Sequence, residues 1–509
     1  MDLNPGISDF EKAYADGRAQ VVWTTLVGDL DTPVSAYLKL VGQDSLGFLM
    51  ESVEGGANRG RYSFVGCRPD LVWRATGNAA EINRTALADP DAFVPCPVSE
   101  TNGTLKSLRA LMAESRIDMP PETHGELPPM AAGLIGYLSY DSVRLVERIP
   151  DDNPDVLDVP DGMFLRPTVI AIFDNASDNV FVVTPVYPDT EVSAEAAFEA
   201  AQQRLARTIQ DFESPLPPQP VESEALDLPE PVSNMEKSGF YAMVDKAKEY
   251  ILAGDIFQVV LSQRFKLPFT LPSFAFYRSL RRVNPSPFLF FLEFGAFQVA
   301  GSSPEILVRL RDGTVTIRPI AGTRPRGATP AEDDALEEDL LADPKERAEH
   351  LMLLDLGRND VGRVAKVGTV NVTDSYIIER YSHVMHIVSN VEGEIADGKD
   401  AIDALYAGFP AGTVSGAPKV RAMEIIDELE PEKRGIYAGC IGYFGADGEM
   451  DTCIALRTAV IKDGYLYAQA GGGVVADSTQ EGEYQESCNK AKALIRAAEE
   501  AVRFARRNN

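Results

Sequence analysis

The sequence has few of the residues that build disulfide frameworks, zinc centres or membrane anchors. Its 509 residues include only five cysteines and four histidines. The cysteines are widely spaced and form no Cys-x-x-Cys pair, which argues against a zinc cluster and for reduced thiols. No apolar run approaches the roughly 20 residues of a membrane span, and the first residues lack the features of a secretory signal. We therefore expect a soluble, cytoplasmic protein.

Basic residues are scarce as well. Lysine and arginine together number 48 against 77 aspartates and glutamates, which gives a formal net charge of -29. Such a surface repels phosphate backbones and anionic lipids, so nucleic-acid or membrane binding is not expected. A site for an anionic substrate must instead concentrate positive charge locally. The hydrophobic content of 45% and the charged content of 25% are typical of a globular protein.

Prolines are concentrated between two parts of the chain. Six of them lie within 213–236, where they favour an extended connector because proline removes backbone donors and disfavours helix. We therefore predict an N-terminal region, 1–235, and a C-terminal region, 236–509. In the latter, Asp-Gly pairs at 312–313, 447–448 and 463–464 separate strand-like runs, and such pairs favour tight hairpin turns. Antiparallel strands interrupted by helices predict an α+β fold.

Two groups of glutamates have helical spacing. Glu346 and Glu349 are three residues apart, and Glu483, Glu486 and Lys490 follow the spacing i, i+3, i+7, so each group shares one helix face. Such a face is most often simply solvated. Carboxylate clusters also suit a hard cation such as Mg²⁺, and the lysine could then meet a substrate carboxylate.

Histidines and glycines mark further candidates. His350, His383 and His386 lie close in sequence; each is either a hydrogen-bonded residue of a sheet or a proton donor or acceptor near neutral pH. The glycine-rich stretch 408–419 precedes a predicted helix, whose amides could bind an anion. The triple glycine 471–473 follows a strand and permits close approach of a ligand to the backbone. Each signal is weak when taken alone.

A series of longer motifs, in order along nearly the whole chain, is highly specific. They are GDIFQVV (254–260), GSSPE (301–305), RPIAGTRP (318–325), AEH (348–350), DLGRND (355–360), 379–389, 412–419 and QAGGG (469–473). Together they closely resemble the chorismate-utilising enzymes, and among these component I of anthranilate synthase. The resemblance implies antiparallel β-sheets packed as a sandwich with flanking helices.

The resemblance also implies an activity and a metal. Ammonia adds to C2 of chorismate, the C4 hydroxyl leaves, and elimination of pyruvate yields anthranilate, in the first committed step of tryptophan biosynthesis. Glu349 and Glu486 are expected to coordinate Mg²⁺, with Glu346 and Glu483 beside them. Glu305 is the candidate acid for the departing hydroxyl, and His386, rather than His383, is the expected catalytic histidine. The expected substrate contacts are Gly322, Thr323, Thr413, Tyr437, Arg457, Gly471, Gly472, Gly473 and Lys490.

Two positions indicate which relative this chain resembles most. Isochorismate and salicylate synthases carry lysine where Gln258 stands, to activate water, and aminodeoxychorismate synthases typically carry a nucleophilic lysine at the position of Ala321. Both departures favour ammonia as the nucleophile and anthranilate as the product. An aminodeoxychorismate synthase large subunit and a non-catalytic regulator that binds chorismate or tryptophan remain as alternatives, although the second would be expected to have lost the metal and histidine positions.

The N-terminal region resembles the segment that binds feedback tryptophan in this family. The matching residues are LMESVEGG (49–56) and RYSF (61–64). Ser52 is expected to contact the inhibitor, and the remaining residues of this effector site are Glu51, Pro287, Phe288, Leu289 and Cys453. Relatives often have Tyr-Met where Phe288 and Leu289 stand, which bears on the fit of the inhibitor.

No cysteine lies in the Gly-x-Cys-x-Gly setting of a glutamine amidotransferase. We therefore expect a separate amidotransferase subunit, the component II of this family, to deliver ammonia from glutamine within a hetero-oligomer. Free ammonia should support the reaction without it.

Overall fold

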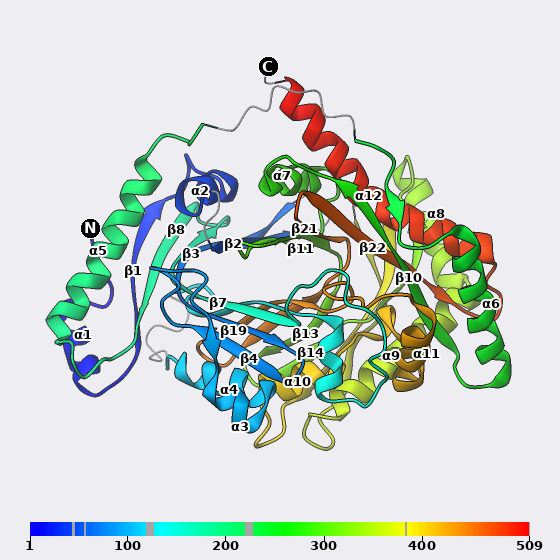
Figure 1. The fold of residues 1–509 in the computed structure, drawn as a ribbon, viewed down its shortest axis with the longest axis horizontal. Coiled ribbons are helices and arrows are strands. Elements are labelled where there is room, and N and C mark those ends of the chain that lie inside the picture. Colours follow the sequence, from blue (N-terminus) through cyan, green and yellow to red (C-terminus); the bar gives the residue numbers. More distant parts are fainter. Residues whose placement is uncertain (43–45, 55–57, 119–126, 219–227, 382–383, 508–509) are drawn as a thin grey trace.

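The structure is a computed structural model that describes residues 1–42, 46–54, 58–118, 127–218, 228–381 and 384–507. Every strand pairing in it is antiparallel, and strands from the whole chain join one hydrogen-bonded network (Figure 1). Two long strands, β3 (Asn58–Thr76) and β7 (Gly162–Asp174), pair with each other and belong to both arms of this network. Within the described residues, every helix is too short or too polar to cross a lipid bilayer.

The first arm of the sheet runs from β7 and β3 toward the C-terminal strands. Its edge beyond β7 is formed by β8 (Asn179–Val186) and β1 (Gln20–Val27). Beyond β3, the order is β2 (Gly47–Glu54), β11 (Phe288–Glu293), β12 (Gln298–Ser303), β21 (Thr458–Lys462), β22 (Tyr465–Val474) and β10 (Gln258–Pro268). The short strands β9 (Val232–Ser233) and β18 (Gly416–Ala417) pair with β10.

The second arm begins where β6 (Gly133–Leu138) pairs with β7. It continues through β19 (Cys440–Gly445), β20 (Met450–Ile454), β13 (Ile306–Arg311), β14 (Thr314–Ile317) and β17 (Val384–Glu394), and β15 (Ile320–Pro325) and β16 (Asn371–Arg380) also pair with β17. Two short strands, β4 (Ala79–Asn83) and β5 (Val94–Pro95), extend β3.

The two arms pack face to face around a shared apolar core. Phe290 and Val299 of the first arm and Ile135, Ile441 and Cys453 of the second belong to one buried cluster. Side chains of two sheets that interdigitate in this way define a β-sandwich. The predicted α+β sandwich is therefore confirmed.

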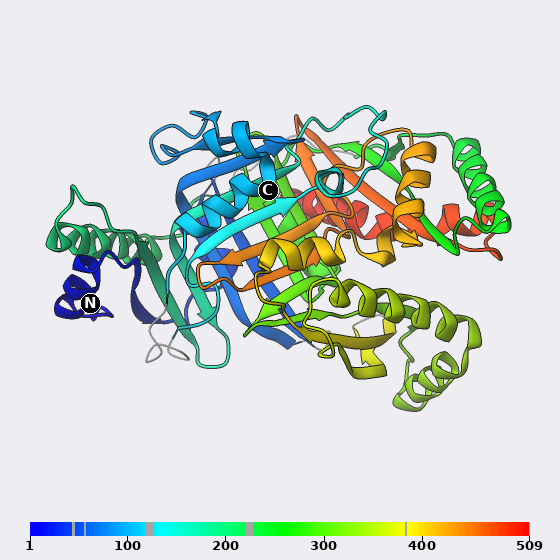
Figure 2. The same ribbon diagram turned by 90° about the horizontal axis from the view of Figure 1, so that it is seen from below.

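Helices cover the outer faces (Figures 1 and 2). One buried cluster joins the first arm to α1 (Ile7–Ala15), α2 (Pro33–Leu40), α5 (Ala194–Glu213), α7 (Ser273–Val283) and α12 (Gln480–Arg507). Another cluster joins the strands to α4 (Thr104–Glu114), α6 (Lys237–Ala253), α9 (Pro344–Gly362), α10 (Ala401–Gly408) and α11 (Lys419–Leu429). The short α3 (Pro97–Asn102) precedes α4, and α8 (Pro330–Ala342) precedes α9.

Local sequence signals explain several of these elements. Asp312 and Gly313 both have positive φ in the turn between β13 and β14, as the Asp-Gly pattern predicts. The Thr329 side chain accepts a hydrogen bond from the Glu332 amide and caps α8. In α12, Ala491, Leu494, Ala498 and Ala501 recur at helical spacing and are buried.

The predicted division near residue 235 stays a prediction, and residues 219–227 of the connector lie outside the described part of the chain. Strands from both sides of this position pair with each other, since β2 pairs with β11 and β6 with β19. The two regions therefore contribute strands to the same sheets.

Candidate active site

The two pairs of helix-spaced glutamates converge from α9 and α12. Burial, and then the nearby charges of Glu346 and Glu486, raise the pKa of Glu349. Burial and the charge of Glu486 likewise raise the pKa of Glu483, against a hydrogen bond from Ser478. Carboxylates from two helices far apart in the sequence thus lie close enough to oppose one another's ionisation.

Glycines allow these carboxylates to approach the strands. A Cβ at Gly472 of β22 would lie 2.6 Å from Glu483 Oε2, and one at Gly473 would lie 2.3 Å from Gln258 Nε2. Gly322 of β15 has a φ of +76°, and a Cβ there would lie 3.2 Å from Glu346 Oε2. A side chain at 472 or 473 would displace the Glu483 carboxylate or the Gln258 amide, so these two glycines allow both groups to keep their positions.

The glutamate site fits a divalent cation with few protein ligands. Glu483 Oε2 is buried and has no hydrogen-bond partner among the described residues. Basic groups reach only part of the site: Arg324 Nη1 lies 3.3 Å from Glu346 Oε1, and Lys490 Nζ lies 2.7 Å from Glu486 Oε1. The described residues contain no preformed cluster of three or more metal ligands. Mg²⁺ is commonly held by one or two carboxylates and completes its shell with water or substrate oxygens, so the arrangement suits that ion.

Glu305 provides a carboxyl group that keeps its proton near neutral pH. Its side chain is buried, and burial raises its pKa to about 8. The Thr413 hydroxyl donates a 2.9 Å hydrogen bond to Oε1, and this bond, with the charges of Lys490 and Arg457, opposes the rise. A neutral carboxylic acid in a pocket is suited to proton donation.

His386 lies on β17, opposite Thr323 of β15. Its Nδ1 is 3.0 Å from the carbonyl oxygen of Gly322 and 3.0 Å from Thr323 Oγ1. A carbonyl oxygen only accepts hydrogen bonds, so Nδ1 carries the proton in the neutral ring and Nε2 keeps its lone pair. Burial lowers the pKa of His386, against the hydrogen bond to Gly322. The ring is therefore neutral and able to accept a proton.

Positive and neutral donors complete the site. Within the described residues, the Arg457 guanidinium makes no hydrogen bond or ion pair, and burial lowers its pKa. Tyr437 is buried, which raises its pKa to about 12, and its hydroxyl is hydrogen-bonded by the backbone of Gly471. Lys490 Nζ donates a 3.0 Å bond to the Gly471 carbonyl. An unpaired guanidinium and a neutral tyrosine hydroxyl are each suited to bind a carboxylate.

The two discriminating positions are uncharged. The Gln258 side chain is buried and hydrogen-bonded to Glu349, and its Oε1 has no partner among the described residues. Ala321 lies on β15 opposite Ile387. Neither residue can act as a base or a covalent nucleophile.

The six predicted effector residues line one cavity of about 720 Å³, hereafter the effector cavity. These residues are Glu51, Ser52, Pro287, Phe288, Leu289 and Cys453. Glu51 is fully engaged, since its carboxylate accepts two hydrogen bonds from Arg281, at 2.8 and 2.6 Å, and one of 2.6 Å from the Tyr277 hydroxyl. The cavity extends to Glu379 and Tyr381, and the ring centroids of Tyr381 and His386 are 5.5 Å apart. It therefore reaches the neighbourhood of the active site.

Sequence reasoning missed several groups of this cavity. Asp451 lines it with Oδ1 buried and without a hydrogen-bond partner among the described residues, and burial raises its pKa. Asp451 stands two residues before Cys453 on β20, so strand alternation could have placed both side chains on one face. Arg318 donates a 2.5 Å hydrogen bond to Glu379, whose other oxygen accepts one of 2.9 Å from the Tyr381 hydroxyl.

Of the two remaining candidate histidines, the structure describes His350. His350 is fully buried, its Nε2 lies 2.7 Å from Ser389 Oγ, and burial lowers its pKa to about 4. Its ring contacts Tyr376. It therefore has the features of a residue of the packed core. His383 lies outside the described residues.

Comparison with known proteins agrees with this geometry. The chorismate binding enzyme family matches residues 63–496. Anthranilate synthase component 1 of Cereibacter sphaeroides is 60% identical over 498 residues, which cover 98% of this chain and 98% of that protein. The protein of the same name from Pseudomonas putida is 47% identical over 487 residues, covering 92% and 93% of the two chains.

Solved structures give the same answer for the fold. The crystal structure of anthranilate synthase component I from Streptococcus pneumoniae matches with a TM-score of 0.73 and 37% identity, covering 92% of this chain and 98% of that chain. The menaquinone-specific isochorismate synthase of Escherichia coli, at 19% identity and a TM-score of 0.69, shares the fold. The family match spans most of the sequence and includes the glutamates, the glycines and the histidine that meet in the site. This chain belongs to the family of chorismate binding enzymes.

Proposed function

We propose that this chain is the large subunit of an anthranilate synthase, which converts chorismate and ammonia into anthranilate and pyruvate. The observation that carries the choice of product is Gln258, a buried amide hydrogen-bonded to Glu349 where a base for water would be needed to make a hydroxylated product. The full-length relatives named anthranilate synthase component 1 support the same choice.

The four glutamates form the proposed Mg²⁺ site. Glu349 and Glu486 hold the ion, and Glu346 and Glu483 lie beside them; the buried, unpartnered Glu483 Oε2 supports this assignment. When bound, Mg²⁺ supplies neutralisation of a substrate carboxylate and so reduces the charge that an incoming nucleophile meets.

The site orients chorismate through its two carboxylates. Arg457, Lys490 and Tyr437 are the proposed donors, and Gly471, Gly472 and Gly473 leave room for the ring against the backbone of β22. Thr323 and Gly322 hold His386 in place, and Thr413 holds Glu305. Holding reactants in one geometry accounts for a large part of the rate acceleration of enzymes.

Two groups move protons. As ammonia bonds to C2 and the C4–O bond breaks, the neutral Glu305 carboxyl donates its proton to the departing hydroxyl, which leaves as water. The ammonium group formed at C2 then releases one proton, which balances the proton that Glu305 gave up. In the second step Nε2 of His386 accepts the proton that leaves C2, the bond between C3 and the enol-ether oxygen breaks, and the ring becomes aromatic. The enolpyruvate released takes up one proton and becomes pyruvate. A raised pKa for the acid and a lowered pKa for the base prepare each group for its role.

The effector cavity is the proposed site of feedback inhibition by L-tryptophan. Its apolar wall of Pro287, Phe288 and Leu289 suits an indole ring, and the free oxygen of Asp451 suits an α-ammonium group. We further propose that ammonia is supplied by a separate glutamine amidotransferase subunit, as the name component 1 of the relatives indicates.

The test is product analysis with chorismate, free ammonia and Mg²⁺. Fluorescent anthranilate and an equal amount of pyruvate are expected. Accumulation of an aminodeoxychorismate instead would refute the proposed function and favour an aminodeoxychorismate synthase. Binding of chorismate or tryptophan without any turnover would indicate a regulator.

A further inference from the structure

A buried ion pair lies behind the site, in the segment between α11 and β19. Arg434 and Glu430 have side chains that are 1% and 3% exposed. The guanidinium donates two hydrogen bonds to the Glu430 carboxylate, from Nε at 2.9 Å and from Nη2 at 2.7 Å. It donates two more, each of 2.7 Å, to backbone carbonyls: Nη1 to Val414 and Nη2 to Val260.

Both carbonyls belong to segments that carry residues of the site. Val414 directly follows Thr413, whose hydroxyl binds Glu305, and Val260 lies two residues after Gln258 on β10. The Val260 amide also donates a 2.9 Å bond to the Ser415 carbonyl. Arg434 and this backbone bond, together with the pairing of β18 with β10, therefore set the separation between the loop that carries Thr413 and the strand that carries Gln258.

Glu430 extends the contact along the same strand. Its Oε1 accepts 2.8 Å hydrogen bonds from both the amide and the hydroxyl of Ser262. Ser262 pairs with Gly471 and Val260 with Gly473, so the ion pair lies behind the triple glycine of β22. The Arg434 guanidinium also lies 5.5 Å from the ring centroid of Tyr437.

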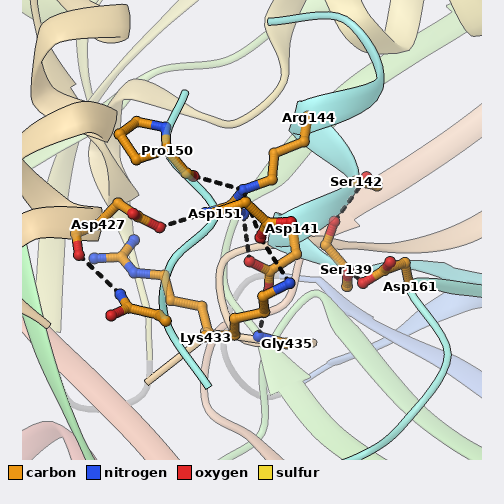
Figure 3. A network of polar contacts seen from close by, with 12 residues as sticks. Ser139, Asp141, Ser142, Arg144, Pro150, Asp151, Asp161, Asp427, Lys433 and Gly435 are labelled. Atoms are coloured by element: carbon orange, nitrogen blue, oxygen red, sulfur yellow. Dashed lines mark hydrogen bonds and ion pairs between the residues drawn. The ribbon is translucent and has the colours of Figure 1, made fainter. Parts of the chain in front are cut away.

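The segment that carries Arg434 is itself held from its other side. The Asp141 carboxylate accepts a 2.7 Å hydrogen bond from the Gly435 amide, and Arg144 links Asp141 to Asp427 (Figure 3). Lys433 forms an ion pair with Asp151 at 2.6 Å. These contacts limit how far Arg434 can move when the loop or the strand moves.

Thermodynamic stability alone does not account for this arrangement. A buried ion pair generally adds little net stability, because removing both charges from water costs about as much as their attraction returns. A guanidinium is the side chain whose planar fork can bind a carboxylate and two carbonyls at once, which an ammonium group cannot do in the same geometry.

We propose that Arg434, oriented by Glu430, is a positioning residue that fixes the loop of Thr413 relative to the strand of Gln258 and thereby aligns the acid Glu305 with the substrate. This inference rests on the proposed function, because it assigns Glu305 its role as the acid.

The first test is Arg434→Lys, which keeps the charge and loses the fork. Misalignment of the acid should lower kcat for anthranilate formation by about 10- to 100-fold, with a smaller change in KM for chorismate. The Thr413 hydrogen bond opposes the raised pKa of Glu305, together with the charges of Lys490 and Arg457. If the Thr413 hydrogen bond is weakened in the variant, the pKa of Glu305 should rise further, and the alkaline limb of the activity profile should move to higher pH.

A matched control is Arg166→Lys. Arg166 is also buried and binds the Asp70 carboxylate in a bidentate manner, at 2.9 and 2.8 Å, but it lies on β7 away from these segments. It should lower the melting temperature while kcat per folded molecule, KM and the alkaline limb stay as in the native chain.

A second variant separates folding from positioning. Arg434→Met combined with Glu430→Gln removes both charges and leaves no uncompensated buried ion. It should fold and show the same loss of kcat and the same shift of the alkaline limb. Native kcat and pH profile in either folded variant would overturn the proposal, and so would failure of both variants to fold, which would assign the pair to folding. If the native chain forms no anthranilate, the proposed function fails instead.

Discussion

The active site and the effector cavity treat negative charge in opposite ways. In the active site, Glu349, Glu486 and Glu483 lie near one another, and their mutual repulsion contributes to raised pKa values of Glu349 and Glu483. In the effector cavity, all three acidic residues are paired with arginines: Glu51 binds Arg281 at 2.6 Å, Glu379 binds Arg318 at 2.5 Å, and Asp451 Oδ2 binds Arg309 at 3.0 Å. Arg324 and Lys490 reach only part of the active-site carboxylates, so the active site needs a further cation, whereas each acidic group of the cavity has an arginine partner.

This difference shows what each site requires from outside. A cluster of carboxylates that is expensive to ionise becomes favourable when a divalent cation binds. A paired, largely apolar cavity with one free carboxylate oxygen, on Asp451, instead suits a neutral zwitterion with an ammonium group. The two sites should therefore respond independently to substitutions of their charged residues.

The largest expected effect comes from removing a proposed metal ligand. Glu486→Gln should lower Mg²⁺-dependent anthranilate formation by on the order of 10³-fold or more, because the cation loses a charged ligand. Tryptophan binding, measured by calorimetry, should be unchanged. The matched control is Glu481→Gln on the same helix, whose carboxylate binds Lys237 at 2.8 Å outside the site. Unchanged turnover in the Glu486 variant would refute the metal assignment.

A smaller effect is expected at the buried acid. Since the pKa of Glu305 is about 8, activity should be present below that pH and decline as the pH rises through it and the proton is lost. Glu305→Gln should reduce kcat by about 10²-fold and remove this decline at alkaline pH. The measurement is the profile of kcat/KM between about pH 6 and about pH 10, a range that brackets the pKa. Thr413→Val, which removes a hydrogen bond that opposes the raised pKa, should move the limb upward. A limb that stays in place in both variants would assign the acid elsewhere.

In the cavity, Ser52→Arg should relieve inhibition with little loss of the uninhibited rate. The larger, charged side chain occupies space needed by the ligand, so the tryptophan concentration for half inhibition should rise about 10-fold or more. Thr25→Arg is the control. Thr25 is exposed on β1, so the introduced arginine adds the same charge outside the cavity. Undiminished inhibition in the Ser52 variant would place the effector site elsewhere.

The smallest effect is expected from a substitution of Tyr381, which lies between the two sites. Tyr381 lines the cavity, binds Glu379 at 2.9 Å and contacts the His386 ring. Tyr381→Phe should weaken inhibition about threefold, the effect of one lost hydrogen bond, while tryptophan still binds. The control is Tyr376→Phe, which removes a hydroxyl that binds the Arg347 carbonyl and should leave inhibition unchanged. Equal inhibition in both variants would separate Tyr381 from the coupling of the sites.

Many features of the fold and of the two sites were predictable from the sequence. Helical spacing identified the faces of Glu346 with Glu349 and of Glu483 with Glu486, and Asp-Gly pairs located hairpins of the sheet. The motifs indicated the family, and through it the fold and the six residues that line the effector cavity. These features depend on local patterns that are preserved when the chain folds.

Other features depend on tertiary contacts and were not predictable. The sequence left His350 between core and catalysis, and burial against Tyr376 and Ser389 is visible only in the fold. Glu430 and Arg434 have the spacing of a helical ion pair, yet α11 ends at Leu429, so the spacing does not explain their contact. The free oxygen of Asp451 also results from strand packing.

The most direct test of the central claim is anthranilate fluorescence from chorismate and ammonia, with Mg²⁺ added or removed by a chelator. We expect formation of anthranilate that depends on Mg²⁺, is lost in Glu486→Gln and is suppressed by tryptophan in the native chain. Anthranilate formation at the same rate after complete removal of divalent cations would contradict it.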